Sequence, residues 1–308
     1  MVKRALKVLV PLIILIILGR AIIENWIQIQ EKLVLNNPIY FLLFILCLVL
    51  THFAGAYFWF KVTGLYSSKV SFKESFRVFV VSNFGRFVPG IALHYAARVY
   101  LSKKLGLKIK EGVSLVVLEA YYTLAGAFVL SFTAFPVVLV KIPNSWLITL
   151  LFFVALLLIF LTPPQIVFNL LKKVSYFRKI IPEFKNFSFN WHIMLLLIPI
   201  LSFFLNGLAF WFLSASLHEI ELSKLIPIIG LFCISWAIGF LTPVAPGGLG
   251  VTDLSLALLL GSFYDFSFAS FLVLVYRFGL IFSEGIVFLF VVKLYGFNMV
   301  FSNNSKDS

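Results

Sequence analysis

Long apolar runs separated by short polar connections make up most of this chain. Runs of about 20 uncharged residues are long enough to cross a bilayer as α-helices. The pattern therefore predicts an all-α integral membrane protein. Six full transmembrane helices are expected at residues 6–23, 39–62, 112–140, 146–161, 192–217 and 267–292.

Two further apolar stretches, residues 76–101 and 225–263, are interrupted by proline and glycine. The first contains "GRFVPG" and the second "TPVAPGGLGVTD". Non-helical backbone at membrane depth is tolerated only where protein buries it or where it lines a wet cavity, because unsatisfied amides are costly in hydrocarbon. The connections flanking the first stretch are basic and those flanking the second are neutral or acidic. Each stretch is therefore expected to enter and leave on one side, as a re-entrant broken-helix hairpin.

The composition agrees with a membrane protein. Hydrophobic residues make up 62% of the chain, charged residues 12%, and the mean hydropathy is +1.07, which is outside the balance of a soluble domain. Lys3, Arg4 and Lys7 before an apolar run also fit a secretory signal peptide. Since no small-residue cleavage site follows, we interpret the run as the first membrane helix.

The net charge of +13 is concentrated in a few connections. Lys and Arg gather at the N-terminus, in residues 61–77, 98–110 and 172–185, and near the C-terminus. The positive-inside rule places such connections in the cytoplasm. We therefore expect a multi-pass protein of the cell membrane with both termini cytoplasmic, and no nucleic-acid partner.

The order of the expected elements is span, span, hairpin, span, followed by the same four with every direction reversed. Residues 1–300 are thus expected to form one polytopic domain, with a first repeat at about 1–140, a second at about 145–295, and a short polar tail at 301–308. Such an inverted-topology repeat is common in transporters, whose substrate sites lie near the midplane between discontinuous helices.

The tips of both hairpins are candidate anion-binding elements, since the N-terminus of a half-helix favours an anion. Asp253, just beyond the second tip, is either a helix cap or part of the site. The candidate tip residues are Pro89, Gly90, Pro246, Gly247, Gly248 and Gly250.

Ionisable residues inside apolar segments are further candidates. Arg98 either snorkels to the inner headgroups or lines the substrate path, and Arg86 either contacts an anionic substrate or lies at the cytoplasmic end. Glu119 and Arg277 lie within spans, where a functional or buried-pair role is expected. Glu284, two helical turns after Arg277, offers a structural ion pair with it as the alternative.

The polarity of these charges is exchanged between the expected repeats. The first has a base, Arg98, in its hairpin and an acid, Glu119, in the next span; the second has Asp253 in its hairpin and Arg277 in its span. Lone charges at the bilayer centre are costly. Mutual neutralisation within each pair, around a hydrated groove, is the simplest reason to keep all four.

The remaining reactive residues favour ordinary packing roles. His52 and His94 are expected to be satisfied interior histidines, and Cys47 and Cys233 to be packing residues. No His, Asp, Glu or Cys residues show metal-ligand spacing, and "GGLG" follows no strand. Neither a metal nor a cofactor is expected.

Several motifs together resemble one known family. "GRFVPG", Arg98, "VVLEAYYTLAG", "TPVAPGGLGVTDLSLALLL" and "VYRFGL" are similar to the lysylphosphatidylglycerol synthase transmembrane region, also called the flippase-like family, over nearly the whole chain. The family commonly has Arg-Glu after the glycine motif, where this chain has Thr252 and Asp253. The resemblance implies translocation of an anionic phospholipid or a polyprenyl-linked lipid between leaflets.

We therefore expect a translocase and no enzyme activity. The family includes the membrane half of multiple peptide resistance factor, whose soluble synthase domain is not expected here because the chain ends at "FSNNSKDS". Two alternatives stay open: a small-solute or ion-coupled secondary transporter, and a membrane subunit of a lipid-modifying or glycosyl-transfer system with Glu119 or Asp253 as general base. A separate synthase or glycosyltransferase partner also stays open.

Overall fold

A computed structural model describes residues 2–33, 37–67, 69–83, 93–137, 146–173, 182–242 and 248–295. These residues form helices and connections, and no strand occurs among them, which confirms the all-α prediction. The α-helices are α1 (Val2–Glu24), α2 (Trp26–Lys32), α3 (Pro38–Gly64), α4 (Phe72–Asn83), α5 (Leu93–Ser102), α6 (Ile109–Ser131), α8 (Trp146–Leu161), α9 (Pro164–Leu171), α11 (Phe189–Leu217), α12 (Leu225–Leu241), α13 (Val251–Leu259) and α14 (Phe266–Tyr295). Short 3₁₀ turns are η2 (Lys103–Leu105), η3 (Phe132–Ala134), η5 (Leu222–Lys224) and η7 (Leu260–Ser262).

Among the described residues, five helical segments are long and apolar enough to cross a membrane. A sixth arises if α1 and α2, which are bent by 72° at their junction, count as one span. The five are Pro38–Gly64, Ile109–Val137, Phe189–Leu217, Leu222–Leu241 and Phe266–Tyr295.

This count differs from the sequence prediction at three helices. The first expected span, residues 6–23 in α1, passes as a span only together with α2; the other two are α8 and the segment Leu222–Leu241. The 16 residues of α8, expected to span, extend only about 24 Å, less than the roughly 30 Å of hydrocarbon. The segment Leu222–Leu241, which belongs to the second expected hairpin, has 20 residues and is itself long enough to cross.

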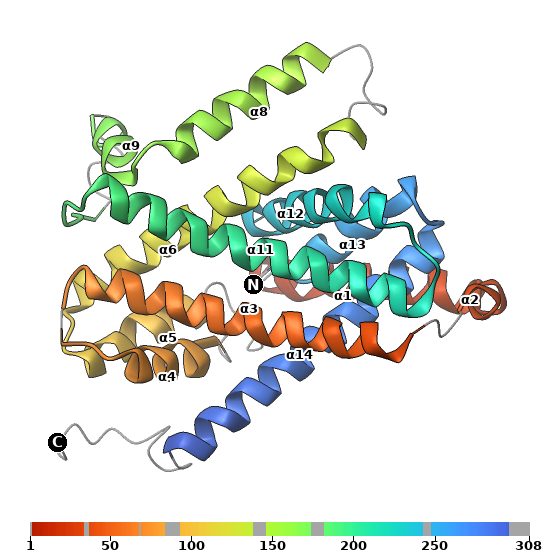
Figure 1. Cartoon of the computed structure of the whole chain (residues 1–308), viewed down its shortest axis with the longest axis horizontal. Coiled ribbons are helices and arrows are strands. Elements are labelled where there is room, and N and C mark those ends of the chain that lie inside the picture. Colours follow the sequence, from red (N-terminus) through yellow and green to blue (C-terminus); the bar gives the residue numbers. More distant parts are fainter. Residues whose placement is uncertain are drawn as a thin grey trace.

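Both expected hairpins contain two helices that contact each other, α4 with α5 and α12 with α13. Figure 1 shows α4 and α5 beside one end of α3, and α12 and α13 toward the opposite end. The breaks between the paired helices, residues 84–92 and 243–247, lie outside the described residues. The two broken helices thus occupy opposite parts of the molecule.

The core consists of two hydrophobic clusters, one around each broken helix. The first joins α12 and α13 to α1 and to parts of α3, α11 and α14. The second joins α4 to α6 and to the other parts of α3, α11 and α14. The three long helices therefore run through both clusters and connect them.

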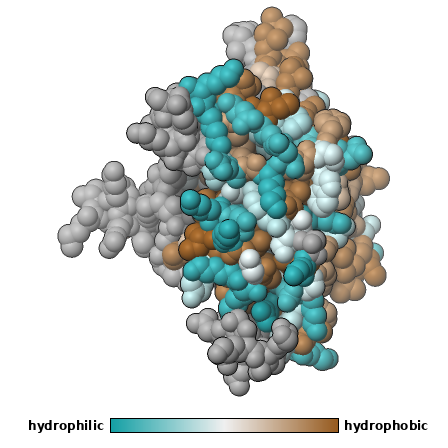
Figure 2. Space-filling view, turned by 90° about the vertical axis from the view of Figure 1, so that its left-hand side faces the viewer, coloured by the Kyte–Doolittle hydropathy of each residue, from teal (hydrophilic) through white to brown (hydrophobic). Residues whose placement is uncertain are grey.

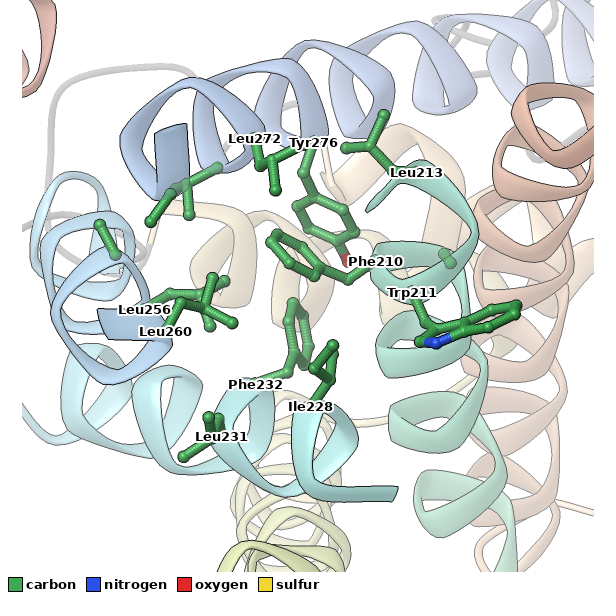
Figure 3. Packing of buried hydrophobic residues seen from close by; sticks show 14 of the residues in the cluster. Phe210, Trp211, Leu213, Ile228, Leu231, Phe232, Leu256, Leu260, Leu272 and Tyr276 are labelled. Carbon is green, nitrogen blue, oxygen red and sulfur yellow. The ribbon is translucent and has the colours of Figure 1, made fainter. Parts of the chain in front are cut away.

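Aromatic rings fill the centre of the first cluster. The ring of Tyr276 lies 5.5 Å from that of Phe210 and 5.3 Å from that of Phe232. Figure 3 shows these rings between α11, α12 and α14, with Leu256 of α13 and Leu260 of η7 facing them. Since aromatic side chains bury the largest apolar areas, this packing fixes α13 against α14 and so determines where the second hairpin tip lies.

Glycines allow close helix approach at two crossings. A Cβ on Gly126 of α6 would lie 2.9 Å from the backbone of Pro199 in α11, and a Cβ on Gly207 of α11 would lie 2.7 Å from Ile229 of α12. Small residues serve this purpose in membrane helix packing, where van der Waals contact takes the place of hydrophobic driving force.

Polar connections gather at the two ends of the long helices. At one end Tyr66 donates to the Glu183 carbonyl at 3.4 Å, Ser114 donates to the same carbonyl at 2.9 Å, and Tyr295 donates to the Lys73 carbonyl. Figure 2 views this end and shows hydrophilic residues spread over it. These are the basic connections that the sequence predicts to share one side.

The opposite end brings together the neutral and acidic connections. Lys32, at the end of α2, forms an ion pair with Asp265, and Trp211 donates to the Glu221 carbonyl at 3.4 Å. Burial opposes a low pKa at Asp265, but the hydrogen bonds from Lys32 and the Phe268 amide outweigh it and hold that pKa below its usual value. Which end faces the cytoplasm stays a prediction.

Candidate functional site

Two glycines shape the N-terminus of α13. Gly248 has a φ of +73° and Gly250 a φ of +79°, a region that favours glycine. A Cβ on Gly248 would also lie 2.7 Å from Thr252 Oγ1, and a Cβ on Gly239 of α12 would lie 1.9 Å from the same atom. The backbones of α12 and α13 therefore approach closely where the chain re-enters the helix.

Asp253 is both a helix cap and an ion-pair partner. Its Oδ2 accepts a hydrogen bond from the Gly250 amide at 2.9 Å, which satisfies one of the open amides at the start of α13. Its Oδ1 accepts from Arg277 Nε at 3.0 Å and from Nη2 at 2.6 Å. The two interpretations of Asp253 that the sequence leaves open are therefore compatible.

The Arg277 side chain is partly accessible, whereas its partner is enclosed. The exposed fraction is 24% for the Arg277 side chain and 6% for that of Asp253. The guanidinium donates to Asp253 from Nε and Nη2, and Nη1 donates to no described residue. One edge of this guanidinium thus remains available to a further acceptor.

The alternative ion pair between Arg277 and Glu284 is not found, although the structure describes both residues. Seven residues along a helix correspond to about 10 Å of rise, so a shared face does not bring these side chains into contact. Arg277 is drawn toward α13, and Glu284 lies farther along α14.

Arg98 occupies a closed polar pocket between four helices. It is 1% exposed, and it donates from Nε to Ser82 Oγ at 2.9 Å, from Nη1 to Glu119 and from Nη2 to Asn83 Oδ1. The Phe79 ring centroid lies 4.4 Å from its Cζ, and that of Trp59 5.3 Å. The side chain points into the protein, so the snorkelling interpretation is wrong.

The expected pairing of the four charges is therefore confirmed. Arg98 of α5 meets Glu119 of α6, and Asp253 of α13 meets Arg277 of α14. The pairs differ in accessibility, because the Arg98 side chain is 2% exposed and that of Arg277 is 24% exposed.

Two buried polar atoms lie near the Arg98 pocket. Glu119 Oε2 and Trp59 Nε1 have no hydrogen-bond partner among the described residues. Such atoms are costly to bury unless water or a ligand group reaches them.

A small cavity lies between α3, α4 and α14. It has a volume of about 10 Å³ and is lined by His52, Val80, Asn83, Glu284 and Val287. His52 is 7% exposed, and its Nε2 lies 3.0 Å from Ser283 Oγ, which confirms the expectation of a hydrogen-bonded interior histidine. His94 is only partly buried, and its ring centroid lies 3.9 Å from that of Tyr95 with the two rings tilted by 40°.

Ser82, Asn83, Ser283 and Asn206 are polar partners that the sequence analysis did not identify. Asn206 Oδ1 accepts from the hydroxyl of the buried Tyr276 at 2.8 Å. Their signal in the sequence is weak, since single neutral polar residues in apolar helices more often bond to the preceding turn of their own helix.

A larger groove of about 470 Å³ follows α11 and has a different character. Its described lining comes from one face of that helix, from Phe189 and Asn190 to Leu201, and contains no charged residue. The uncharged lining of this groove therefore differs from the charged site that Asp253 and Arg277 form.

Several candidates lie outside the described residues: Arg86, Pro89, Gly90, Pro246 and Gly247. Within the described ranges, no group of three His, Cys, Asp or Glu residues is placed to hold a metal ion. Cys47 and Cys233 are buried in the first cluster, as packing residues should be.

The chain was also compared with known proteins. A search of curated proteins finds no match. The family model for the lysylphosphatidylglycerol synthase TM region matches residues 4–283. The matched residues include both buried ion pairs, Arg98 with Glu119 and Asp253 with Arg277. The chain is an integral multi-pass membrane protein that belongs to the lysylphosphatidylglycerol synthase transmembrane-region family.

Proposed function

We propose that this protein translocates an anionic phospholipid or a polyprenyl-linked lipid between leaflets, and that Arg277 receives the lipid phosphate. The proposal rests on the surroundings of this arginine. A buried carboxylate, that of Asp253, binds it, yet the arginine side chain itself is 24% exposed. An arginine that is anchored on one edge and accessible on the other suits a phosphate, which it binds through parallel N–H groups.

The surroundings of Arg277 also favour an anion. It lies beside the N-terminus of α13, where aligned amides carry a partial positive charge. Gly248 and Gly250 have no side chain to cover the backbone at this turn, and of the open amides that the structure describes here only that of Gly250 is already taken, by Asp253 Oδ2. An anionic headgroup therefore meets both a guanidinium edge and backbone donors.

Asp253 acts as the positioning residue for this arginine. Its carboxylate neutralises the guanidinium, which lowers the cost of keeping a charge in the membrane. Because a single oxygen, Oδ1, accepts from both Nε and Nη2, the guanidinium is held in one orientation while Nη1 stays available. The phosphate would then bind without the ion pair having to break.

The same proposal includes an inverted-topology repeat with two re-entrant hairpins. It is supported by the exchanged polarity of the two ion pairs and by the separate hydrophobic clusters around α4 and around α12 with α13. Both termini would be cytoplasmic. The chain would act as a translocase and depend on a separate synthase or glycosyltransferase for the lipid it carries.

Reconstitution in proteoliposomes tests this function. Vesicles would contain fluorescently tagged phosphatidylglycerol or, as a zwitterionic comparison, tagged phosphatidylcholine, and a membrane-impermeant quencher would report the lipid that reaches the outer leaflet. The protein should accelerate exchange of the anionic lipid well beyond that of the zwitterionic lipid. Arg277→Gln should remove most of this acceleration, whereas Arg20→Gln, at an exposed surface pair, should not.

Two results would contradict the proposal. Exchange no faster than in empty vesicles, with protein that is folded by size-exclusion chromatography, would exclude a phospholipid translocase. Equal acceleration of both lipids in wild type and Arg277→Gln would exclude a phosphate role for Arg277.

A further inference from the structure

Two cations of α4 lie against one tyrosine of α14. The Nζ atom of Lys73 lies 5.1 Å from the ring centroid of Tyr295, and the Cζ atom of Arg77 lies 5.4 Å from it. The Tyr295 hydroxyl donates to the Lys73 carbonyl, so the ring is fixed between the start of α4 and the end of α14. Figure 1 shows the end of α14 near α4, and the two helices are in contact.

The positive charges around Tyr295 repel one another. Lys73 and Arg77 are four residues apart on α4, so they share one face of the helix, an arrangement that destabilises it when the charges are alike. Burial, together with the guanidinium of Arg77, lowers the pKa of Lys104 in η2, so a third cation lies within electrostatic reach. The face of the Tyr295 ring offsets part of this repulsion. An anion placed between the cations would offset the rest.

No described acid neutralises Lys73 or Arg77, since neither residue forms an ion pair with a described residue. The neighbouring acid, Glu74, accepts at Oε2 from the Ser71 amide at 3.2 Å and from the Ser71 hydroxyl at 2.9 Å. The structure describes every Asp and Glu of the sequence except Asp307, near the C-terminus. Asp307 is therefore the one acid for which the experiment needs a control.

An apolar surface continues along α14 from these cations into the membrane. The ring of Phe290 lies 6.3 Å from that of Phe76 in α4 and 6.1 Å from that of Phe53 in α3. Phe290 and Leu294 are 45% and 46% exposed. Phe290 precedes Tyr295 by about 7.5 Å of helix rise, so it lies deeper than the cations. Positive charge at the helix ends and apolar surface beneath it match the headgroup and the acyl chain of an anionic phospholipid.

We propose that Lys73, Arg77 and Tyr295 form a binding site for an anionic phospholipid of the leaflet at the basic end. The lipid phosphate lies between the two cations, and an acyl chain follows Phe290 and Leu294. Arginine suits the phosphate because it donates through parallel N–H groups, and lysine adds a compact positive charge. The bound lipid bridges α4 and α14 and neutralises the repulsion between the cations.

This site is separate from the one proposed for transport. Tyr295 follows Arg277 by about 27 Å of helix rise along α14. The lipid at Tyr295 is therefore a resident component of the protein, and the lipid at Arg277 is the cargo. Binding of the resident lipid requires no translocation, so it can be measured in detergent.

Thermal unfolding in an uncharged detergent measures this binding. All proteins carry Asp253→Asn and Arg277→Gln, which remove the charges of the transport site together and leave no carboxylate unpaired. Added phosphatidylglycerol should raise the thermal midpoint in a saturable way, since a ligand that binds only the folded state stabilises it. Phosphatidylcholine should not. Arg77→Gln and Lys73→Gln should each raise the half-saturating concentration of phosphatidylglycerol roughly tenfold or more, as expected for loss of a hydrogen bond from a charged group.

Lys185→Gln is the matched control variant. Lys185 is exposed at the same end of the molecule, and its Nζ lies 5.2 Å from the ring centroid of Tyr66, so the change removes an equal charge beside a different tyrosine. It should leave the half-saturating concentration unchanged, and so should Asp307→Asn. Inorganic phosphate and glycerol 1-phosphate present the anion without acyl chains and should give no shift where the lipid saturates. Midpoints without lipid confirm that each variant is folded.

Several results would overturn the site. If phosphatidylglycerol gives no shift, or if Lys185→Gln weakens binding as much as Arg77→Gln does, the cations attract lipid only as part of a diffuse charge. An equal shift with inorganic phosphate would assign them to a free anion. Tighter lipid binding in Asp307→Asn would assign them to the chain's own tail. Each of these results leaves the proposed function standing, because that function is decided by exchange between leaflets.

Discussion

Asp253 Oδ1 accepts two hydrogen bonds from one arginine, Arg277, at 3.0 Å and 2.6 Å, and so ties the first turn of α13 to the middle of α14. The other carboxylate oxygen accepts from the Gly250 amide. One side chain therefore fixes both the start of a helix and the direction of a buried cation. Loss of either partner should have distinguishable effects.

Arg277→Ala should reduce both stability and translocation. It leaves the Asp253 carboxylate buried without its cation, a loss of about 1–3 kcal/mol or more for a charged group. Asp253→Asn keeps an oxygen that can cap α13, so it should lower the thermal midpoint less and act mainly on transport. Thermal unfolding in detergent and lipid exchange, measured on the same preparations, compare the two variants.

A double-mutant cycle with these two residues measures the pair itself. A coupling energy of about 0.5–3 kcal/mol is expected for residues in direct contact. Coupling indistinguishable from zero would mean that the two side chains contribute to stability independently, in spite of their contact.

The ion pair of Arg98 with Glu119 should respond differently, because Arg98 is buried and all three of its side-chain nitrogens donate hydrogen bonds. Removal of one partner from a buried ion pair commonly costs about 3–5 kcal/mol. Arg98→Ala should therefore destabilise the protein more than Arg277→Ala. Arg98→Lys should rescue little, since an ammonium lacks the planar fork that reaches Ser82, Asn83 and Glu119 together.

Thermal midpoints of Arg98→Ala, Arg98→Lys and Arg277→Ala, measured side by side, check this order. Equal midpoints for Arg98→Lys and wild type would show that charge alone, without the fork geometry, satisfies the pocket.

The charge pattern alone was sufficient to predict both ion pairs. Arg98, Glu119, Asp253 and Arg277 interrupt apolar segments, and the cost of a lone buried charge requires partners of opposite sign. The helices that carry them were also predicted, because apolar length and polar connections are local properties of the chain.

The neutral members of the site could not be predicted in the same way. Ser82 and Asn83 bind Arg98 because α4 packs beside α5, and His52 meets Ser283 because α3 crosses α14. Those contacts depend on helix rotation and crossing, which composition does not specify. The alternative ion pair between Arg277 and Glu284 fails for a geometric reason. Residues seven apart share a helix face but lie about 10 Å apart along the axis.

Gly248 should tolerate substitution poorly. Its φ of +73° and the 2.7 Å approach of a Cβ to Thr252 Oγ1 predict a loss of about 1–3 kcal/mol for Gly248→Ala. Gly261→Ala is the control, because a Cβ there meets nothing within 4 Å. In the double variant Gly248→Ala, Thr252→Ala, the contact with the hydroxyl is removed while the backbone strain remains, so recovery should be partial.

Thermal unfolding and lipid exchange together decide the role of this glycine. A Gly248→Ala protein with wild-type stability and transport would show that the turn accepts a side chain. The stronger change, Val at both Gly247 and Gly248, should abolish transport more than it reduces membrane insertion, because valine covers the backbone amides.

Cysteine labelling tests the orientation on which the inverted repeat depends. Ser67, in the connection after α3, and Lys110, at the start of α6, flank the first broken helix and belong to the basic end of the molecule. Single cysteines at both positions should react only with reagents that reach the cytoplasm, by the positive-inside rule. A cysteine at the exposed Glu219, after α11, should react only from outside, in a background where Cys47 and Cys233 are replaced by Ala.

The decisive comparison is between positions 67 and 110. The paired contacts of α4 with α5 allow the chain to return to the side it left, so both positions should be labelled from one face. If they react from opposite faces, α4 and α5 together cross the membrane once, and the second half of the chain then has the same direction as the first. In that case the exchanged polarity of the two ion pairs would need an explanation other than inversion, because Arg98 and Asp253 would no longer occupy equivalent hairpins.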